Sequence, residues 1–273
     1  LNLPENTPIG TIFGQVLGVD PDADANLTYT FGAVFPPDLS PGAWFDADDP
    51  NALWQDTTAL LEANQTGHGI GLWQDRTSHE RNATMATFAT QPILRKNFLN
   101  GRPVLRFDGS NYLDVDFSWL ANKDYTIIAV EGRRSSDEQY YLLNTSGNDN
   151  QRGHFGYYRN NWYMLDQSSN RLSFSIPNYS VQTFRAWTHW FDNATGHKIF
   201  LNGVSVASNT NKTGFSSVTN GKIGAGYSTN HAFKGDLAEI IAFDSALPKD
   251  KVEQVHEYLA LKWGLPMSKN YLE

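Results

Sequence analysis

The chain has 273 residues, a formal net charge of −8 from 21 basic and 29 acidic side chains, and no cysteine. This length is enough for one large or two modest domains with a buried core. The excess of acidic residues and the lack of a run of Lys or Arg argue against nucleic acid as a partner. The absence of cysteine excludes thiol catalysis and Cys-ligated zinc. No apolar stretch approaches the ~20 residues of a membrane span.

The first 35 residues differ in pattern from the rest of the chain. Residues 11–19 form a strand-like apolar run, and residues 26–31 alternate apolar with polar side chains, as a half-buried strand does. An acidic turn, DPDAD at residues 20–24, lies between them. We therefore expect residues 1–41 to form a separate strand segment or a linker arm.

This segment, with its PEN motif at residues 4–6, resembles the opening strands of a cadherin-like repeat, without that repeat's later strands or terminal calcium motif. In that family the acidic side chains bind calcium at the joints between successive repeats. The resemblance therefore implies calcium as a cofactor, with Glu5, Asp20 and Asp22 among its ligands. The remaining ligands would come from a neighbouring domain of the same chain.

Prolines at 36, 37 and 41 mark a boundary, after which many short strands are separated by Gly, Asn and Asp clusters. Clear examples lie at residues 103–107, 125–130, 198–201 and 237–243. Strands at this spacing without interleaved helices predict an all-β sandwich of two antiparallel sheets. The exception is a helix face formed by Val252, Val255 and Leu259, which begins near Pro248 and ends by Gly264. Residues 267–273 are interpreted as a tail, with the expression vector as one source of it.

Five stretches in order resemble one family: AWFDADD at residues 43–49, WQDRT at 73–77, NGRPVLRFDGSNYL at 100–113, FLNG at 200–203 and FKGDLAEIIAFD at 233–244. They are similar to the laminin G-like domain of bacterial surface proteins, within the concanavalin A-like lectin/glucanase superfamily. The resemblance implies a jelly-roll sandwich over residues 42–266 and an extracellular or cell-surface location. Relatives include lectins, adhesion modules and polysaccharide-binding modules, so the fold alone does not decide the function.

An enzyme is the weaker interpretation. A retaining glycosidase needs two carboxylates on one side of its substrate, but Glu239 and Asp244 are five positions apart along one predicted strand, an odd spacing, so they point to opposite faces. The tripeptide QVH at residues 254–256 resembles a polysaccharide lyase motif, yet it falls in the predicted helix. The remaining histidines show no metal-binding spacing, and we predict no catalytic residue.

The most suggestive binding element is an aromatic hairpin around residues 160–161, where two Asn residues suit a two-residue turn. That register pairs Arg159 with Trp162 and Tyr158 with Tyr163. One face would pack in the core, and the other could present rings that stack on sugars. The alternative is that these aromatic side chains are simply core. The predicted ligand contacts are Tyr157, Tyr158, Arg159, Trp162 and Tyr163.

A second candidate calcium site is the turn DGSN, from Asp108 to Asn111, whose oxygens are of the type that calcium prefers. The alternative is an ordinary tight turn, which Asp-Gly commonly forms.

We expect a non-catalytic module that binds a glycan or another cell-surface ligand within a larger secreted protein. A structural or protein-interaction module is the first alternative, and a polysaccharide hydrolase or lyase is the second.

Overall fold

The computed structural model describes residues 35–36, 38–136, 139–145, 153–158, 162–167, 170–176, 183–215, 220–225 and 232–266. The chain divides into two units, Leu1–Ala33 and Val34–Glu273, and the account below concerns the second. The segment predicted to resemble a cadherin-like repeat, with its predicted calcium ligands Glu5, Asp20 and Asp22, lies outside the described residues.

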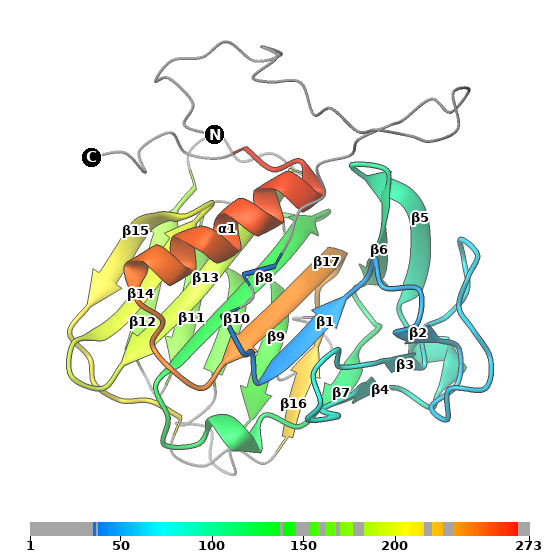
Figure 1. The fold of residues 1–273 in the computed structure, drawn as a ribbon, viewed down its shortest axis with the longest axis horizontal. Coiled ribbons are helices and arrows are strands. Elements are labelled where there is room, and N and C mark those ends of the chain that lie inside the picture. The colour runs from blue at the N-terminus through cyan, green and yellow to red at the C-terminus, as the bar shows by residue number, and fades with distance from the viewer. Residues whose placement is uncertain are drawn as a thin grey trace, which may run out of the picture. The chain divides into compact units, whose positions relative to one another are not determined.

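One sheet has eight described strands, all antiparallel to their neighbours (Figure 1). Their order across the sheet is β15 (Val204–Asn209), β14 (Gly196–Leu201), β13 (Phe184–Asp192), β8 (Tyr125–Arg133), β17 (Lys234–Phe243), β6 (Arg102–Asp108) and β5 (Ile93–Leu99). The eighth strand, β1 (Ala43–Asp46), pairs with β17 beside this path.

The other sheet has nine described strands, also antiparallel. Their order is β12 (Asn170–Ser175), β11 (Trp162–Gln167), β10 (Gly153–Tyr158), β9 (Gln139–Thr145), β16 (Asn220–Ile223), β7 (Leu113–Val115), β4 (Ala83–Thr84), β3 (Leu72–Trp73) and β2 (Leu53–Trp54). Two short 3₁₀ helices, Phe88–Thr90 and Ser118–Leu120, lie in the connections. The predicted fold class is confirmed.

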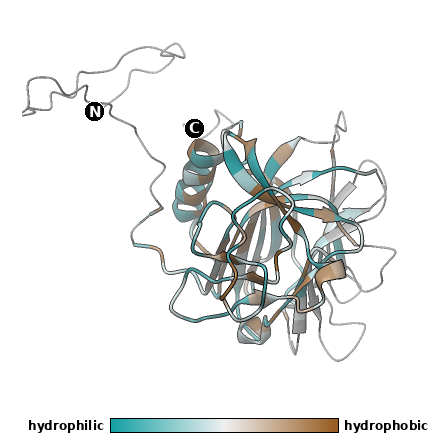
Figure 2. Ribbon diagram, turned by 90° about the vertical axis from the view of Figure 1, so that its right-hand side faces the viewer, coloured by the Kyte–Doolittle hydropathy of each residue, from teal (hydrophilic) through white to brown (hydrophobic). Residues whose placement is uncertain are grey.

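The core lies between the two sheets and follows from the alternation of side chains along the strands. On β8, Tyr125, Ile127 and Ala129 are buried against residues of the other sheet such as Phe155. Tyr125 also stacks on Phe215, with ring centroids 4.6 Å apart. Hydrophobic strand segments accordingly gather in the middle of the sandwich (Figure 2). Aromatic residues, which make up 13% of the chain, supply much of this interior.

Helix α1 (Lys249–Trp263) lies across the outer face of the eight-stranded sheet (Figure 1). Its predicted apolar face, Val252, Val255 and Leu259, is at most 1% exposed. The helix ends at Gly264, whose φ of 65° is the left-handed conformation that glycine adopts most easily. Both predicted limits of the helix are therefore confirmed. Among the described residues, α1 and the shorter helices lack the length and apolarity of a membrane span.

A single buried carboxylate ties α1 to the sheet. Glu239, on β17, accepts hydrogen bonds from Trp44 Nε1 at 2.6 Å and from Trp263 Nε1 at 2.6 Å. Tyr258 donates its hydroxyl to the same carboxylate at 2.9 Å, and Lys262 Nζ approaches at 3.0 Å. Burial and the neighbouring Asp46 carboxylate raise the pKa of Glu239. A carboxylate with four donors is a satisfied buried group, so we refer to these five residues (Trp44, Glu239, Tyr258, Lys262 and Trp263) as the helix clamp.

Candidate functional site

The β10–β11 hairpin has a different register from the one expected. Tyr158 pairs with Trp162, and Tyr157 pairs with Tyr163. The predicted pairing of Arg159 with Trp162 is therefore wrong by one residue, because three residues rather than two separate the paired ends. A shift of one residue exchanges the faces of β11 relative to β10.

Tyr157 lies in the core between the two sheets. Its side chain is 0% exposed, and its hydroxyl donates a hydrogen bond to Glu131 Oε1 on β8. Trp187 Nε1 donates to the same oxygen at 2.9 Å, and the Arg133 guanidinium lies 4.2 Å from the Tyr157 ring centroid. Tyr157 therefore connects the two sheets, and its prediction as a surface ligand contact is corrected to a core position.

Glu131 supplies the carboxyl group of this buried cluster, and its pKa is strongly shifted. Burial raises its pKa to about 7, against the lowering effect of the hydrogen bonds from Tyr157 and Trp187 and of the charges of Arg185 and Arg133. Its second oxygen, Oε2, accepts no hydrogen bond from the described residues. The group holds a proton near neutral pH but is sealed between the sheets, so a ligand at the surface does not reach it.

The register of the nine-stranded sheet defines a row of cross-strand neighbours that crosses it from edge to edge. The row runs Trp54, Leu72, Thr84, Asp114, Lys222, Leu143, His154, Asp166 and Arg171. The adjacent row contains the buried Leu113, Ile223, Phe155 and Leu172. Since successive residues of a strand alternate between faces, the first row lies on the outer face. We call it the outer row.

The centre of the outer row carries opposite charges beside an aromatic ring. Lys222 Nζ forms an ion pair with Asp114, and it lies 4.0 Å from the ring centroid of Tyr112. The Asp114 side chain is 55% exposed and that of Lys222 is 32% exposed, and Arg171 at the edge of the row is exposed. These groups offer hydrogen-bond donors, acceptors and a ring face to solvent, which is the chemistry that hydroxyl-rich ligands require.

The remaining hairpin residues are placed by register alone. Tyr158 and Trp162 are cross-strand partners. Along their strands they are two residues from the Gly156–Met164 pair and four residues from the His154–Asp166 pair of the outer row. The register places the backbone of Tyr158, Trp162 and Tyr163, while their side chains lie outside the described part of the structure. Arg159 lies outside the described residues. As ligand contacts, Tyr158, Arg159, Trp162 and Tyr163 stay predictions.

The Asp108 to Asn111 turn is closed by its own hydrogen bonds. Asp108 Oδ1 accepts from Ser110 N at 2.8 Å and from Ser110 Oγ at 2.7 Å. Asn111 Oδ1 accepts from Asp108 N at 2.8 Å, while its Nδ2 donates to the Gln91 carbonyl at 2.9 Å. Nowhere in the described part of the chain do three or more acidic or histidine side chains group as a metal site would require. The geometry favours the tight-turn interpretation of this motif.

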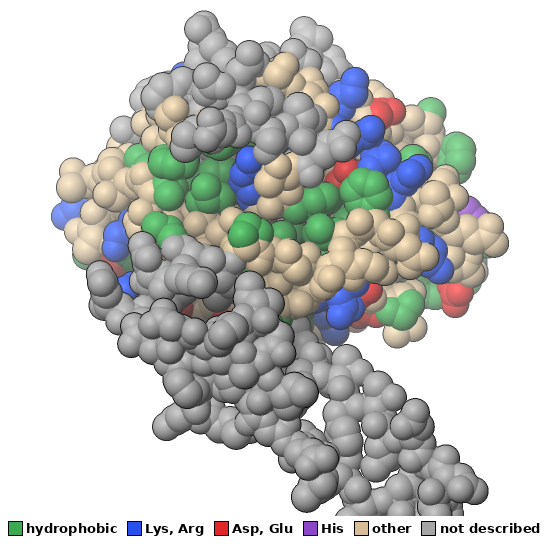
Figure 3. Space-filling model, turned by 90° about the horizontal axis from the view of Figure 1, so that it is seen from above, with side chains coloured by type: hydrophobic (Ala, Val, Ile, Leu, Met, Phe, Trp, Pro, Cys, Tyr) green, Lys and Arg blue, Asp and Glu red, His purple; other side chains and the backbone are tan. Residues whose placement is uncertain are grey.

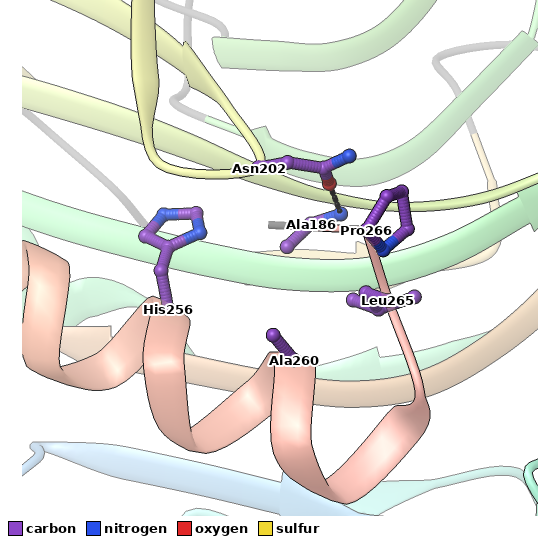
Figure 4. Close-up of a pocket in the computed structure, with 6 residues that line it drawn as sticks. All are labelled: Ala186, Asn202, His256, Ala260, Leu265 and Pro266. Carbon is purple, nitrogen blue, oxygen red and sulfur yellow. Dashed lines mark hydrogen bonds between the residues drawn. The ribbon is translucent and has the colours of Figure 1, made fainter. Parts of the chain in front are cut away.

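The lyase-like QVH tripeptide lies on α1, as its placement in the predicted helix implied. His256 Nε2 is 2.6 Å from Thr188 Oγ1, and burial lowers the pKa of His256 to about 4. The crevice beside it, shown with Ala186, Asn202 and Leu265 in Figure 4, is too narrow to admit water. His256 is therefore a packing residue at the helix–sheet contact.

Two larger cavities open on the described surface. One, of about 200 Å³, lies between the first turn of α1 and strands β13 to β15. The other, of about 260 Å³, is lined by residues 122–124, 191, 193 and 212–215. Elsewhere, hydrophobic side chains lie next to Lys and Arg on the face seen in Figure 3. One described pairing of this kind places the Arg106 guanidinium 4.7 Å from the Phe98 ring centroid.

Sequence reasoning missed the Asp114–Lys222 pair and the Glu131 group. Asp114 and Lys222 are 108 residues apart, and Glu131 and Trp187 are 56 apart. Neither pair belongs to a local motif, so only the strand order could have revealed it.

The sequence pattern described as the concanavalin A-like lectin/glucanases superfamily matches residues 107–253. The fold is similar to that of domain 4 of AbnA, a GH43 extracellular arabinanase from Geobacillus stearothermophilus, solved in complex with arabinotriose. The TM-score is 0.55 and the identity 15%, over 79% of this chain and 98% of that one.

The fold is also similar to that of Trypanosoma rangeli sialidase in complex with sialic acid, with a TM-score of 0.52 and 11% identity. That match covers 78% of this chain but only 37% of the sialidase, so it concerns part of that protein. At these identities the likeness is one of fold alone. No curated protein matches the chain.

Proposed function

Because the chain belongs to the concanavalin A-like lectin/glucanases superfamily, we propose that it is a non-catalytic carbohydrate-binding module of a larger extracellular protein. Its fold resembles an arabinanase domain that was solved with a bound arabinose oligomer. The cadherin-like segment and its calcium ligands Glu5, Asp20 and Asp22 are proposed as the link to a neighbouring domain.

The observation that carries this proposal is the outer row. It crosses nine strands, and its described members combine Trp54, the Asp114–Lys222 ion pair and the exposed Arg171. Leu72 and His154 of the row are buried, and the exposed polar groups between and beyond them suit an oligosaccharide, whose hydroxyls exchange hydrogen bonds along its length. Rings at the Tyr158 and Trp162 positions would stack on the apolar faces of the sugars.

The non-catalytic part of the proposal is supported by the position of the two buried glutamates. Glu131 is 0% exposed and Glu239 is 1% exposed. Each is committed to hydrogen bonds within the sandwich, from Tyr157 and Trp187 to the first and from the helix clamp to the second. Neither acid is offered to the space above the outer row, where a glycosidase would need a pair.

The test is calorimetric titration of the whole chain with arabino-oligosaccharides and a panel of neutral and acidic glycans, with and without calcium. We expect binding to at least one glycan, and a loss of tenfold or more in Trp162→Ala, which is about 1.4 kcal/mol. Leu261→Ala is the matched control, because Leu261 is 66% exposed on α1, over the other sheet.

Equal losses in the two variants would refute the outer face as the site. Silence across the whole panel would refute glycan binding and favour the protein-interaction module.

A further inference from the structure

The cavity of about 200 Å³ beside α1 belongs to the outer face of the eight-stranded sheet, away from the outer row. We call it the helix-edge cavity. Its lining includes Trp190 from β13, Lys198 and Phe200 from β14, Ser205 from β15, and Leu247 and Lys249 at the start of α1.

The floor of the helix-edge cavity is apolar and fixed. Trp190 is 9% exposed and Phe200 is 8% exposed. Trp190 Nε1 donates to the Leu247 carbonyl at 2.9 Å, and Leu247 N donates to Thr126 Oγ1 at 2.9 Å. These bonds tie the ring to the segment that leads into α1. A ligand entering the cavity therefore meets a floor that is already in place, which lowers the entropic cost of binding.

The rim of the cavity is positively charged. Lys198 Nζ lies 4.4 Å from the Trp190 ring centroid, and among the described residues no carboxylate is within ion-pair distance of it. Lys249 lies at the opening with its side chain 76% exposed, and its Nζ forms an ion pair with Glu253 Oε1 at 3.4 Å.

The backbone adds to this field. Helix α1 begins at Lys249, and Lys249 and Val252 of its first turn line the cavity, so the positive end of the helix dipole lies beside the opening. Asp250 in the first turn offsets part of this field but does not lie in the cavity lining.

The cavity volume suits one ring-sized group. At the ~30 Å³ that a water molecule occupies in the liquid, 200 Å³ corresponds to about seven waters. Drug-sized ligands occupy pockets of about 300–1,000 Å³. A group that fits must combine an apolar face for the floor with a negative charge for Lys198, and hydroxyls suit the exposed Ser205 at the rim.

We infer that the helix-edge cavity binds a single uronic-acid residue, a pyranose ring that carries a carboxylate. The carboxylate pairs with Lys198, and the ring packs over Phe200 and the edge of Trp190. This site is separate from the outer row and goes beyond the proposed function, so either of the two can fail alone.

The test is a titration of the whole chain with methyl β-glucuronide, followed by NMR chemical shifts and intrinsic tryptophan fluorescence. Methyl β-glucoside, which lacks the carboxylate, is the matched ligand. We expect glucuronide binding in about the millimolar range, at least tenfold tighter than glucoside binding, and weakening as salt increases.

The key variant is Lys198→Met, which keeps an unbranched side chain against Trp190 but removes the charge. It should reduce glucuronide affinity about tenfold, while Lys212→Met, at the other cavity, should not change it. Ser205→Glu, at an exposed rim position, is a second variant and should also weaken binding by placing a like charge beside the carboxylate.

Equal binding of glucuronide and glucoside, equal effects of Lys198→Met and Lys212→Met, or no glucuronide binding would each overturn the inference. Lys198 and Lys212 line different cavities, both away from the outer row, so the difference between their variants separates this result from the fate of the outer face.

Discussion

Replacing Glu131 by Gln should change how the stability of the fold depends on pH. Burial raises the pKa of Glu131 from 4.5 to about 7 in the folded state. The folded protein therefore binds this proton more tightly than the unfolded chain does. The stability that the proton contributes is fully present below about pH 4.5, and it is lost as the pH rises through about 7.

The size of the effect follows from the same values. A tenfold change in proton affinity corresponds to about 1.4 kcal/mol, so the difference between 4.5 and about 7 amounts to roughly 3 kcal/mol. The Glu131→Gln amide can still accept the hydrogen bonds of Tyr157 and Trp187, but it does not titrate. The variant should therefore gain stability over the wild type by roughly 2–3 kcal/mol between about pH 5 and about pH 8.

Urea unfolding of both proteins across this pH range measures the difference directly, because the titration of all other groups cancels. Glu257→Gln is the matched control, since Glu257 is exposed on α1, and its difference from wild type should stay flat. If the Glu131→Gln and wild-type curves run parallel, Glu131 does not hold its proton in the folded state, and the reasoning fails.

Two further predictions concern the frame of the sandwich. Glu239→Ala removes the acceptor of four hydrogen bonds and leaves Asp46, at 2.7 Å, as the only described carboxylate paired with the Lys262 ammonium. Urea unfolding should therefore show a loss of about 3–5 kcal/mol in the free energy of unfolding. A loss below about 1 kcal/mol would contradict the role of the helix clamp. Gly196→Ala should cost about 3 kcal/mol by thermal unfolding, because φ is +112° and a Cβ would lie 2.2 Å from the Asn209 carbonyl oxygen. Gly101→Ala, with a φ of +74° but no atom within 4 Å, should cost about 1 kcal/mol, and similar losses at both sites would refute the steric argument.

The layers of this fold could be predicted because they depend on local periodicity. Tyr125, Ile127 and Ala129 alternate with the residues of the opposite face, and the sandwich places them as the pattern indicates. The apolar face of α1 and its glycine stop were visible for the same reason. The ordered motifs added the family, which local patterns alone do not identify.

The candidate site could be predicted only in part because it depends on register and on distant partners. A two-residue turn and a three-residue connection are both compatible with the sequence around residues 159–161, yet they assign Trp162 to opposite faces. Glu131 looks like any surface glutamate until β8 is placed against Tyr157 and Trp187. The charge pair of Asp114 and Lys222 likewise exists only because β16 lies beside β7.

The helix clamp also bears on how much of the chain makes a self-sufficient unit. The family pattern covers residues 107–253, which include Glu239. All four of its donors lie outside that range: Trp44 precedes it, and Tyr258, Lys262 and Trp263 follow it. A protein truncated to residues 107–253 would keep the buried Glu239 carboxyl group but lose all four of its hydrogen-bond donors, including the Lys262 ammonium. We therefore expect the unit that can be transplanted intact into another protein to extend from β1 to the end of α1, and its packing during synthesis to be completed only once that last helix has been made.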